Sequence, residues 1–171
     1  MKKIVVFGKP GSGKSTLSKR LALATGIKLH AVDSIEFEAN GERVDRAIYD
    51  KIHDSILSSD DWIIDGFGPI ASFKQRLDAA DTLIFIDLPY AVSYWLVTKR
   101  LLKGVFVKPE GWPEGSSVLK GSLQSYKVLK LCPKFWNKDF KQNLEKVSAG
   151  KSLHVIRSIS ELDSFVENYV V

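Results

Sequence analysis

The sequence predicts an α/β protein in which a parallel sheet is covered by helices on both faces. Short apolar runs of strand length alternate with longer stretches of helical period along the chain, a pattern typical of parallel strands joined by helical crossovers. Four of the five predicted strands end at or next to Asp or Arg, at the carboxyl edge where such sheets bind ligands. We therefore expect a single domain spanning residues 1–171.

The first strand and the first helix are predicted around a glycine-rich segment. Lys3 to Phe7 is a β-branched apolar run, and Gly8 to Ser15 fits the phosphate-binding pattern G-x-x-x-x-G-K-[ST] at every fixed position. Glycines let backbone amides approach an anion, Lys14 reaches the outer phosphates, and a serine hydroxyl suits Mg²⁺. The alternative is an ordinary glycine-rich turn that carries a lysine. The predicted nucleotide contacts are Gly8, Pro10, Gly11, Ser12, Gly13, Lys14, Ser15 and Thr16.

The next elements are predicted from apolar spacing and turn residues. A helix from Ser15 to about Ala24 stops before Gly26, and a second strand, Ile27–Val32, ends at Asp33. The helix that follows has apolar residues four positions apart, which predicts its buried stripe and leaves His53 on its surface; the stripe is Val44, Ile48, Ile52 and Ile56.

The second half of the chain continues the alternation. Three further strands are predicted at Trp62–Asp65, Thr82–Asp87 and Leu153–Ile156. The predicted helices are residues 72–78, residues 90–102, two basic stretches separated at Cys132-Pro133, and a terminal helix opened by Ser160. Residues 104–117 are rich in Gly and Pro, include Trp112, and predict one long loop. Loops of this length in compact domains are usually functional.

Charge is distributed unevenly along the chain. The formal net charge is +5, but residues 99–157 carry +9, residues 1–98 carry −1 and the tail carries −3. The basic segment would attract a ligand with several phosphates or a nucleic acid, although solvated surface lysines explain the same composition. The single cysteine, with no signal segment and no apolar stretch of membrane length, predicts a cytoplasmic protein.

Several segments resemble the nucleoside and nucleotide kinase branch of the P-loop proteins. Trp62-Ile-Ile-Asp-Gly-Phe67 is similar to the Leu-Leu-Asp-Gly-Phe-Pro segment of adenylate kinases, and Ile86-Asp-Leu-Pro89 is similar to their next strand end. Together with His30-x-x-Asp33 and Arg76-Leu-x-x-Ala-Asp81, the order is most similar to the adenylate kinase-like proteins called DNA topology modulation proteins. The resemblance implies a three-layer P-loop fold with strand order 2-3-1-4-5 and a helical lid inserted at about residues 103–120.

The resemblance also implies where each partner binds. ATP would lie on the glycine-rich loop with Mg²⁺ supported by Ser15 and Asp65, and the acceptor would lie over strands two and three. Arg100, at the hinge of the lid, would swing onto the transferring phosphate; the alternative is that it only complements the dipole at the C-terminal end of its helix. Arg157, after the last strand, would border the adenine pocket. Adenylate kinases carry an arginine after Asp-Gly-Phe-Pro, and its nearest substitute in this chain is Arg76.

These features predict a Mg²⁺-dependent phosphotransferase that moves the γ-phosphate of ATP to a small molecule, with a nucleotide or nucleoside-like acceptor. If the reacting group is a hydroxyl, Asp33 would orient it or accept its proton; if it is a phosphate, this carboxylate would instead bind Mg²⁺ or a sugar. The competing prediction is a nucleotide-binding regulator or ATPase that contacts nucleic acid through residues 99–157. The sequence is compatible with a monomer or a homodimer. The catalytic candidates are Lys14, Asp33, Asp65 and Arg100.

Overall fold

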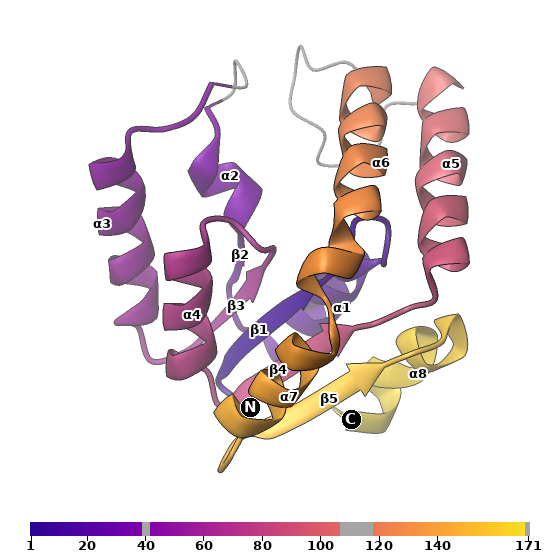
Figure 1. The fold of residues 1–171 in the computed structure, drawn as a ribbon. Helices are drawn as coiled ribbons and strands as arrows, with labels where there is room; N and C mark the ends of the chain where they lie inside the picture. Colours follow the sequence, from indigo (N-terminus) through magenta and orange to yellow (C-terminus); the bar gives the residue numbers. More distant parts are fainter. Residues whose placement is uncertain (39–41, 107–117, 170–171) are drawn as a thin grey trace.

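The computed structural model describes residues 1–38, 42–106 and 118–169 and contains one sheet of five parallel strands. The strands lie side by side in the order β2-β3-β1-β4-β5 (Figure 1). The α/β class and the strand order predicted from the sequence are therefore confirmed. In chain order the strands are β1 (Lys3–Gly8), β2 (Leu29–Ala31), β3 (Trp62–Asp65), β4 (Thr82–Ile86) and β5 (Ser152–Ile156).

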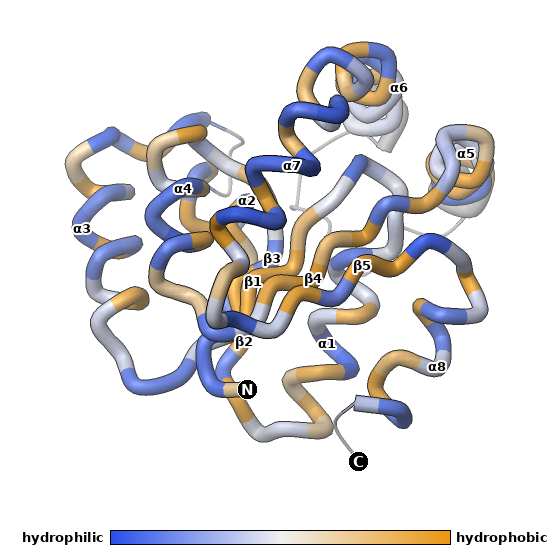
Figure 2. The backbone as a smooth tube through the Cα atoms, turned by 60° about the horizontal axis from the view of Figure 1, so that its bottom comes forward, coloured by the Kyte–Doolittle hydropathy of each residue, from blue (hydrophilic) through white to orange (hydrophobic). Residues whose placement is uncertain are grey.

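Helices cover both faces of this sheet, and two more rise beyond its carboxyl end (Figures 1 and 2). One face packs on α1 (Lys14–Thr25) and α8 (Ile159–Tyr169). The other packs on α3 (Arg46–Leu57), α4 (Ile70–Ala79) and α7 (Lys138–Val147). The short α2 (Val32–Glu36) follows β2 directly, while α5 (Tyr90–Phe106) and α6 (Val118–Phe135) form an antiparallel pair. Within the described residues, no helix combines the length and apolar character of a membrane span.

The central strand β1 contributes to both halves of the core. Ile4 and Val6 face α1 and α8, whereas Val5 and Phe7 face the opposite layer, and all four side chains are fully buried. Because successive strand residues point to opposite faces, a strand buried on both sides is apolar at every position. Complete burial of each of these side chains stabilises the fold by about 1.5–3 kcal/mol. The buried strand therefore anchors the start of the loop that follows β1.

Helix α3 buries a different face from the one predicted. Ile48 and Ile52 are 55% and 39% exposed, whereas Tyr49 and His53 are almost completely buried. The prediction of a surface position for His53 is therefore wrong. Tyr49, His53 and Ile56 also recur at helical spacing, and the stacked Tyr49 and His53 rings, 5.8 Å apart, pack on the sheet side instead of the isoleucines.

Three predicted boundaries in the second half also differ. The break at Cys132-Pro133 is wrong, because α6 continues to Phe135 with Pro133 in its last turn. Pro133 cannot donate the i→i−4 hydrogen bond, and the helix ends shortly after it. The terminal helix is capped by Ser158 instead of Ser160, since the Ser158 hydroxyl accepts the amide of Glu161 at 3.1 Å. The predicted loop at 104–117 starts later, because α5 extends to Phe106. Trp112 and most of the predicted lid insertion lie outside the described residues.

Candidate functional site

The glycine-rich loop Gly8–Ser15 connects β1 to α1 and is held between two helices. Gly11 and Gly13 have φ angles of 71° and 82°, in the left-handed region that favours glycine. A Cβ atom on Gly11 would lie 2.6 Å from Val97 Cγ2 of α5, and one on Gly13 would lie 2.7 Å from Leu162 Cδ2 of α8. The loop conformation is therefore set by contact with both helices as well as by the backbone angles.

Replacing Gly11 by alanine is expected to destabilise the protein more than replacing Gly26 by alanine. Gly26 has almost the same φ, 72°, but a Cβ atom there meets nothing within 4 Å. Both substitutions should therefore incur a backbone cost of about 1–2 kcal/mol, and only Gly11→Ala should add about 1–3 kcal/mol from overpacking against Val97. Urea denaturation of the two variants measures the difference, and equal losses would show that the contact with α5 is unimportant.

Lys14 lies at the centre of the candidate site. Its Nζ donates a hydrogen bond to the carbonyl oxygen of Lys9 at 2.9 Å, within the same loop. Burial lowers the pKa of Lys14, and the nearby carboxylates of Asp65 and Asp33 act in the opposite direction. The carboxylates of Asp65 and Asp33 therefore favour the charged form of Lys14, whereas burial disfavours it.

Asp65 and Asp33 reach this point from two neighbouring strands. Asp65 ends β3, opposite Val6 of β1, and is only 5% exposed, whereas Asp33 lies in the first turn of α2 and is exposed. Burial raises the pKa of Asp65, while Lys14 and Ser15 act against that rise. One carboxylate oxygen of Asp65, Oδ1, is buried and has no hydrogen-bond partner in the described part of the chain.

Arg100 approaches the loop from α5. Its Nη2 donates to the Ser125 hydroxyl of α6 at 2.7 Å, and its charge is close enough to Lys14 to lower the pKa of that lysine. Burial lowers the pKa of Arg100 itself. The helix pair is joined further by Thr98 and Tyr126, whose hydroxyl groups are 2.6 Å apart. The structure thus brings the four catalytic candidates Lys14, Asp33, Asp65 and Arg100 into one region.

A buried ion pair beneath the loop was missed by the sequence analysis. Lys9 is 1% exposed, and its Nζ contacts Asp87 Oδ1 at 2.5 Å and lies 4.8 Å from the centre of the Tyr90 ring. Asp87 Oδ2 contacts Lys141 Nζ of α7, also at 2.5 Å. Burial acts to raise the pKa of Asp87, but the hydrogen bonds from Lys141 and Lys9 outweigh it and hold that pKa below its usual value. Asp87 therefore links the Gly8–Ser15 loop to helix α7, on the face of the sheet that also packs on α3 and α4.

The remaining residues that were predicted to contact the nucleotide differ in how exposed they are. Ser12 is fully buried, Pro10 is half-buried and Thr16 is exposed at the start of α1. Arg157 is exposed beyond β5, and its backbone amide donates a hydrogen bond to Glu161 Oε2 at 2.8 Å. The structure therefore shows no side-chain contact of Arg157, within the described residues, that would orient it toward the loop.

Arg76 does not take the place of the arginine that adenylate kinases carry after Asp-Gly-Phe-Pro. Its guanidinium is completely buried and donates hydrogen bonds to the Phe67 carbonyl oxygen and to the Tyr49 hydroxyl. Burial lowers the pKa of Arg76, although Tyr49 and Glu36 counteract this shift. Arg76 supports the turn that follows β3 and does not present its charge to a ligand.

Ser15 and Asp65 fit the partial ligand set that Mg²⁺ commonly has beside a nucleotide. The described residues contain no group of three or more His, Cys, Asp or Glu side chains that could hold a metal by itself. Mg²⁺ usually keeps several waters and takes one or two protein ligands together with phosphate oxygens. The unpartnered Oδ1 atom of Asp65 and the neighbouring Ser15 hydroxyl supply such a pair of oxygens.

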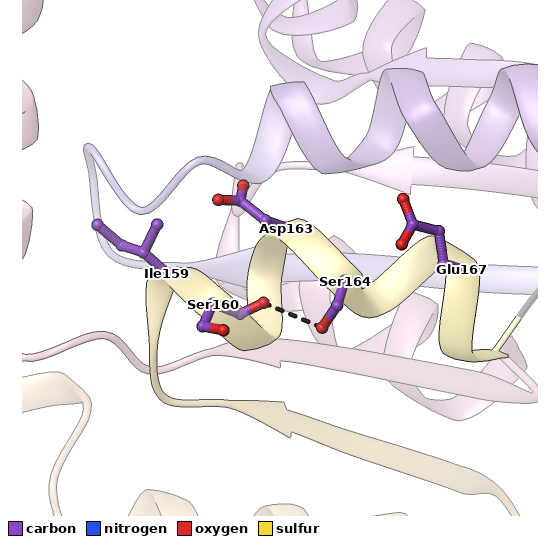
Figure 3. A pocket seen from close by; sticks show the side chains of 5 residues that line it. All are labelled: Ile159, Ser160, Asp163, Ser164 and Glu167. Atoms are coloured by element: carbon purple, nitrogen blue, oxygen red, sulfur yellow. Dashed lines mark hydrogen bonds between the residues drawn. The ribbon is translucent and has the colours of Figure 1, made fainter.

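A separate hollow on the outer face of α8 is less suited to a phosphate ligand. Its lining side chains all come from this one helix, and the carboxylates of Asp163 and Glu167 point to the same side (Figure 3). The Ser164 hydroxyl is used by the helix itself, since it donates to the Ser160 carbonyl oxygen at 3.0 Å. Two neighbouring carboxylates repel a phosphate, so the candidate site is the loop and not this hollow.

A comparison of the chain with protein-family models found no match, and a search of curated proteins found no match either.

Proposed function

We propose that the protein is a Mg²⁺-dependent small-molecule kinase that uses ATP as donor and a nucleotide or nucleoside-like metabolite as acceptor. The observation that carries the proposal is the position of Lys14 beside Asp65 and Asp33, at the carboxyl edge where the Gly8–Ser15 loop opens a helix. A glycine-rich loop at a helix N-terminus is suited to phosphate binding. The additional carboxylates on the neighbouring strand ends favour group transfer to a second substrate over phosphate binding alone.

In this proposal, transfer depends on charge placement more than on covalent chemistry. The loop amides and Lys14 would hold the β- and γ-phosphates, and Ser15 and Asp65 would hold Mg²⁺. When bound, Mg²⁺ neutralises charge on the phosphate oxygens. Arg100 provides a further cation from α5, where its hydrogen bond to Ser125 couples its position to that of α6. Asp33 faces the acceptor.

The direct test is ATP binding followed by turnover with a panel of acceptors. We expect Mg·ATP to bind, slow hydrolysis without acceptor, and faster ADP release with one class of nucleotide, nucleoside or related metabolite. Binding is measured by calorimetry and turnover by ADP release. No binding of Mg·ATP at millimolar concentration would refute the proposal.

A second candidate, a nucleotide-dependent protein that contacts nucleic acid, is favoured by one observation. The segments of α5 and α6 contain no acidic residue, and Lys127, Lys130 and Lys134 are exposed on α6. Other lysines of the basic segment are engaged within the fold, since Lys141 pairs with Asp87 and Lys151 donates to carbonyl oxygens at the end of α4. A mobility shift of duplex DNA that weakens with salt would support this candidate, and no shift at low salt would exclude it.

Asp65→Asn is expected to stabilise the ligand-free protein while reducing turnover. The raised pKa of Asp65 means that the folded chain binds the proton more tightly than the unfolded chain, so stability falls as pH rises from about 3.9 through the folded pKa. Removing the charge should therefore raise the free energy of unfolding at pH 7. Denaturant titrations at several pH values check this, because the gain should shrink toward pH 4. A loss of stability at pH 7 would contradict it.

A further inference from the structure

The segment on the β2 side of the sheet, from α2 through α3, carries an excess of negative charge. From Asp33, in the first turn of α2, to Leu57, at the end of α3, the sequence has seven acidic and three basic residues. Both arginines of this stretch are already ion-paired: Arg43 contacts Glu36 at 3.5 Å, and Arg46 contacts Asp50 at 2.8 Å. The remaining carboxylates of this segment are not neutralised by the two arginines, so the segment produces a net negative field.

The helices on the β4 side of the sheet, α5 and α6, carry an excess of positive charge. The segments Tyr90–Phe106 and Val118–Phe135, which form α5 and α6, contain seven Lys and Arg residues and no acidic residue. In Figure 1 these helices rise on the β4 side of the glycine-rich loop, whereas α2 and α3 stand on the β2 side. A polyphosphate is therefore attracted to one side of the site and repelled from the other.

Asp33 adds a specific contact to this general field. Ala31 at the end of β2 pairs with Asp65 of β3, and Asp33 follows Ala31 in the first turn of α2, so the two carboxylates lie at neighbouring strand ends. Within the described part of the chain, the Asp33 carboxylate makes no hydrogen bond or ion pair. An acceptor phosphate at this point would meet two carboxylates, and the buried Arg76 guanidinium is already bonded to Phe67 and Tyr49. A hydroxyl group, in contrast, can donate its proton to Asp33 in a hydrogen bond.

On the basis of the kinase function proposed above, we infer that the acceptor is an alcohol without a phosphate group, neutral or cationic, whose hydroxyl is bound by Asp33. The hydroxyl oxygen attacks the γ-phosphorus of ATP and forms the new P–O bond. The bond from the γ-phosphorus to the β–γ bridging oxygen breaks, and ADP leaves with that electron pair. Asp33 accepts the hydroxyl proton and later releases it to water. The products are a phosphate monoester, ADP and one proton.

The test compares matched acceptors, each offered as the free alcohol and as its phosphate monoester: nucleosides, amino alcohols and sugars. The expected result is turnover of at least one alcohol with kcat/KM at least about tenfold above that of its monoester. Faster turnover of the monoesters overturns the inference, as does failure of every alcohol while ATP hydrolysis persists. The kinase proposal stands if the monoesters are phosphorylated instead, whereas it fails if Mg·ATP is not bound or if no acceptor of either kind is phosphorylated.

Asp33→Asn separates the role of this carboxylate from general effects on the fold. We expect kcat toward the alcohol to fall by about 10²–10⁴ while the dissociation constant for Mg·ATP changes less than about twofold. Asp60→Asn, at an exposed position between α3 and β3, is the matched control and should retain wild-type turnover. Unchanged alcohol turnover in Asp33→Asn would overturn the assignment of Asp33.

Discussion

Lys14→Met is expected to lower phosphoryl transfer by about 10²–10³ in kcat while leaving the fold intact. Methionine keeps the apolar stem but removes the cation that, in the proposed kinase, the glycine-rich loop would direct toward the phosphates. The other lysine of the loop, Lys9, is paired with Asp87. A fixed charge that stabilises a transition state typically contributes an effect of this size. Steady-state ADP release with saturating acceptor measures it.

The stability of Lys14→Met shows whether a loss of turnover comes from the missing charge or from unfolding. Burial lowers the pKa of Lys14 even though Asp65 and Asp33 oppose the shift, so the folded state gains nothing from holding this charge. The variant should therefore unfold at the same denaturant concentration as the wild type, or higher. Lys74→Met, at an exposed position on α4, is the control. Full turnover by Lys14→Met would refute the role proposed for the loop.

The strand ends were the most predictable part of the molecule. Apolar runs identified the strands, and since parallel strands share one carboxyl edge, Asp33 and Asp65 were expected near Lys14. The structure places them there, with Asp65 opposite Val6 and both carboxylates acting on Lys14. The strand order itself followed from the resemblance to kinases and not from the apolar pattern, which specifies alternation but not which strands are neighbours.

The sequence pattern was less informative where two sets of residues both have helical spacing, and where a contact joins residues far apart in the chain. On α3, the isoleucine stripe and the Tyr49–His53 stripe both have helical spacing, and only packing against the sheet selects the second. The Lys9–Asp87 pair joins positions 78 residues apart, and no local pattern connects them. Arg76 was considered as a ligand contact because of its charge, whereas its burial beneath the turn after β3 depends on the tertiary structure.

Asp87→Ala is expected to destabilise the protein by about 3–5 kcal/mol, because it leaves Lys9 buried without its counter-charge. Lys9 is almost fully enclosed, and after the substitution the Tyr90 ring would still lie beside its ammonium group but no carboxylate of the described residues would pair with it. Lys141 is about half exposed, so Lys141→Met should cost less than about 1 kcal/mol. Urea denaturation at pH 7 compares the two variants with the wild type.

The pH dependence and the double variant identify the cause of this loss. Because Lys141 and Lys9 hold the pKa of Asp87 below its usual value, the stabilisation from Asp87 is present above about pH 3.9 and is lost as pH falls through the folded pKa. Lys9→Met combined with Asp87→Ala removes both buried charges and should recover most of the lost stability, since an apolar replacement of a buried pair is often neutral. A double variant as unstable as Asp87→Ala would show that Asp87 acts through its backbone position or through Lys141, and not by compensating the Lys9 charge.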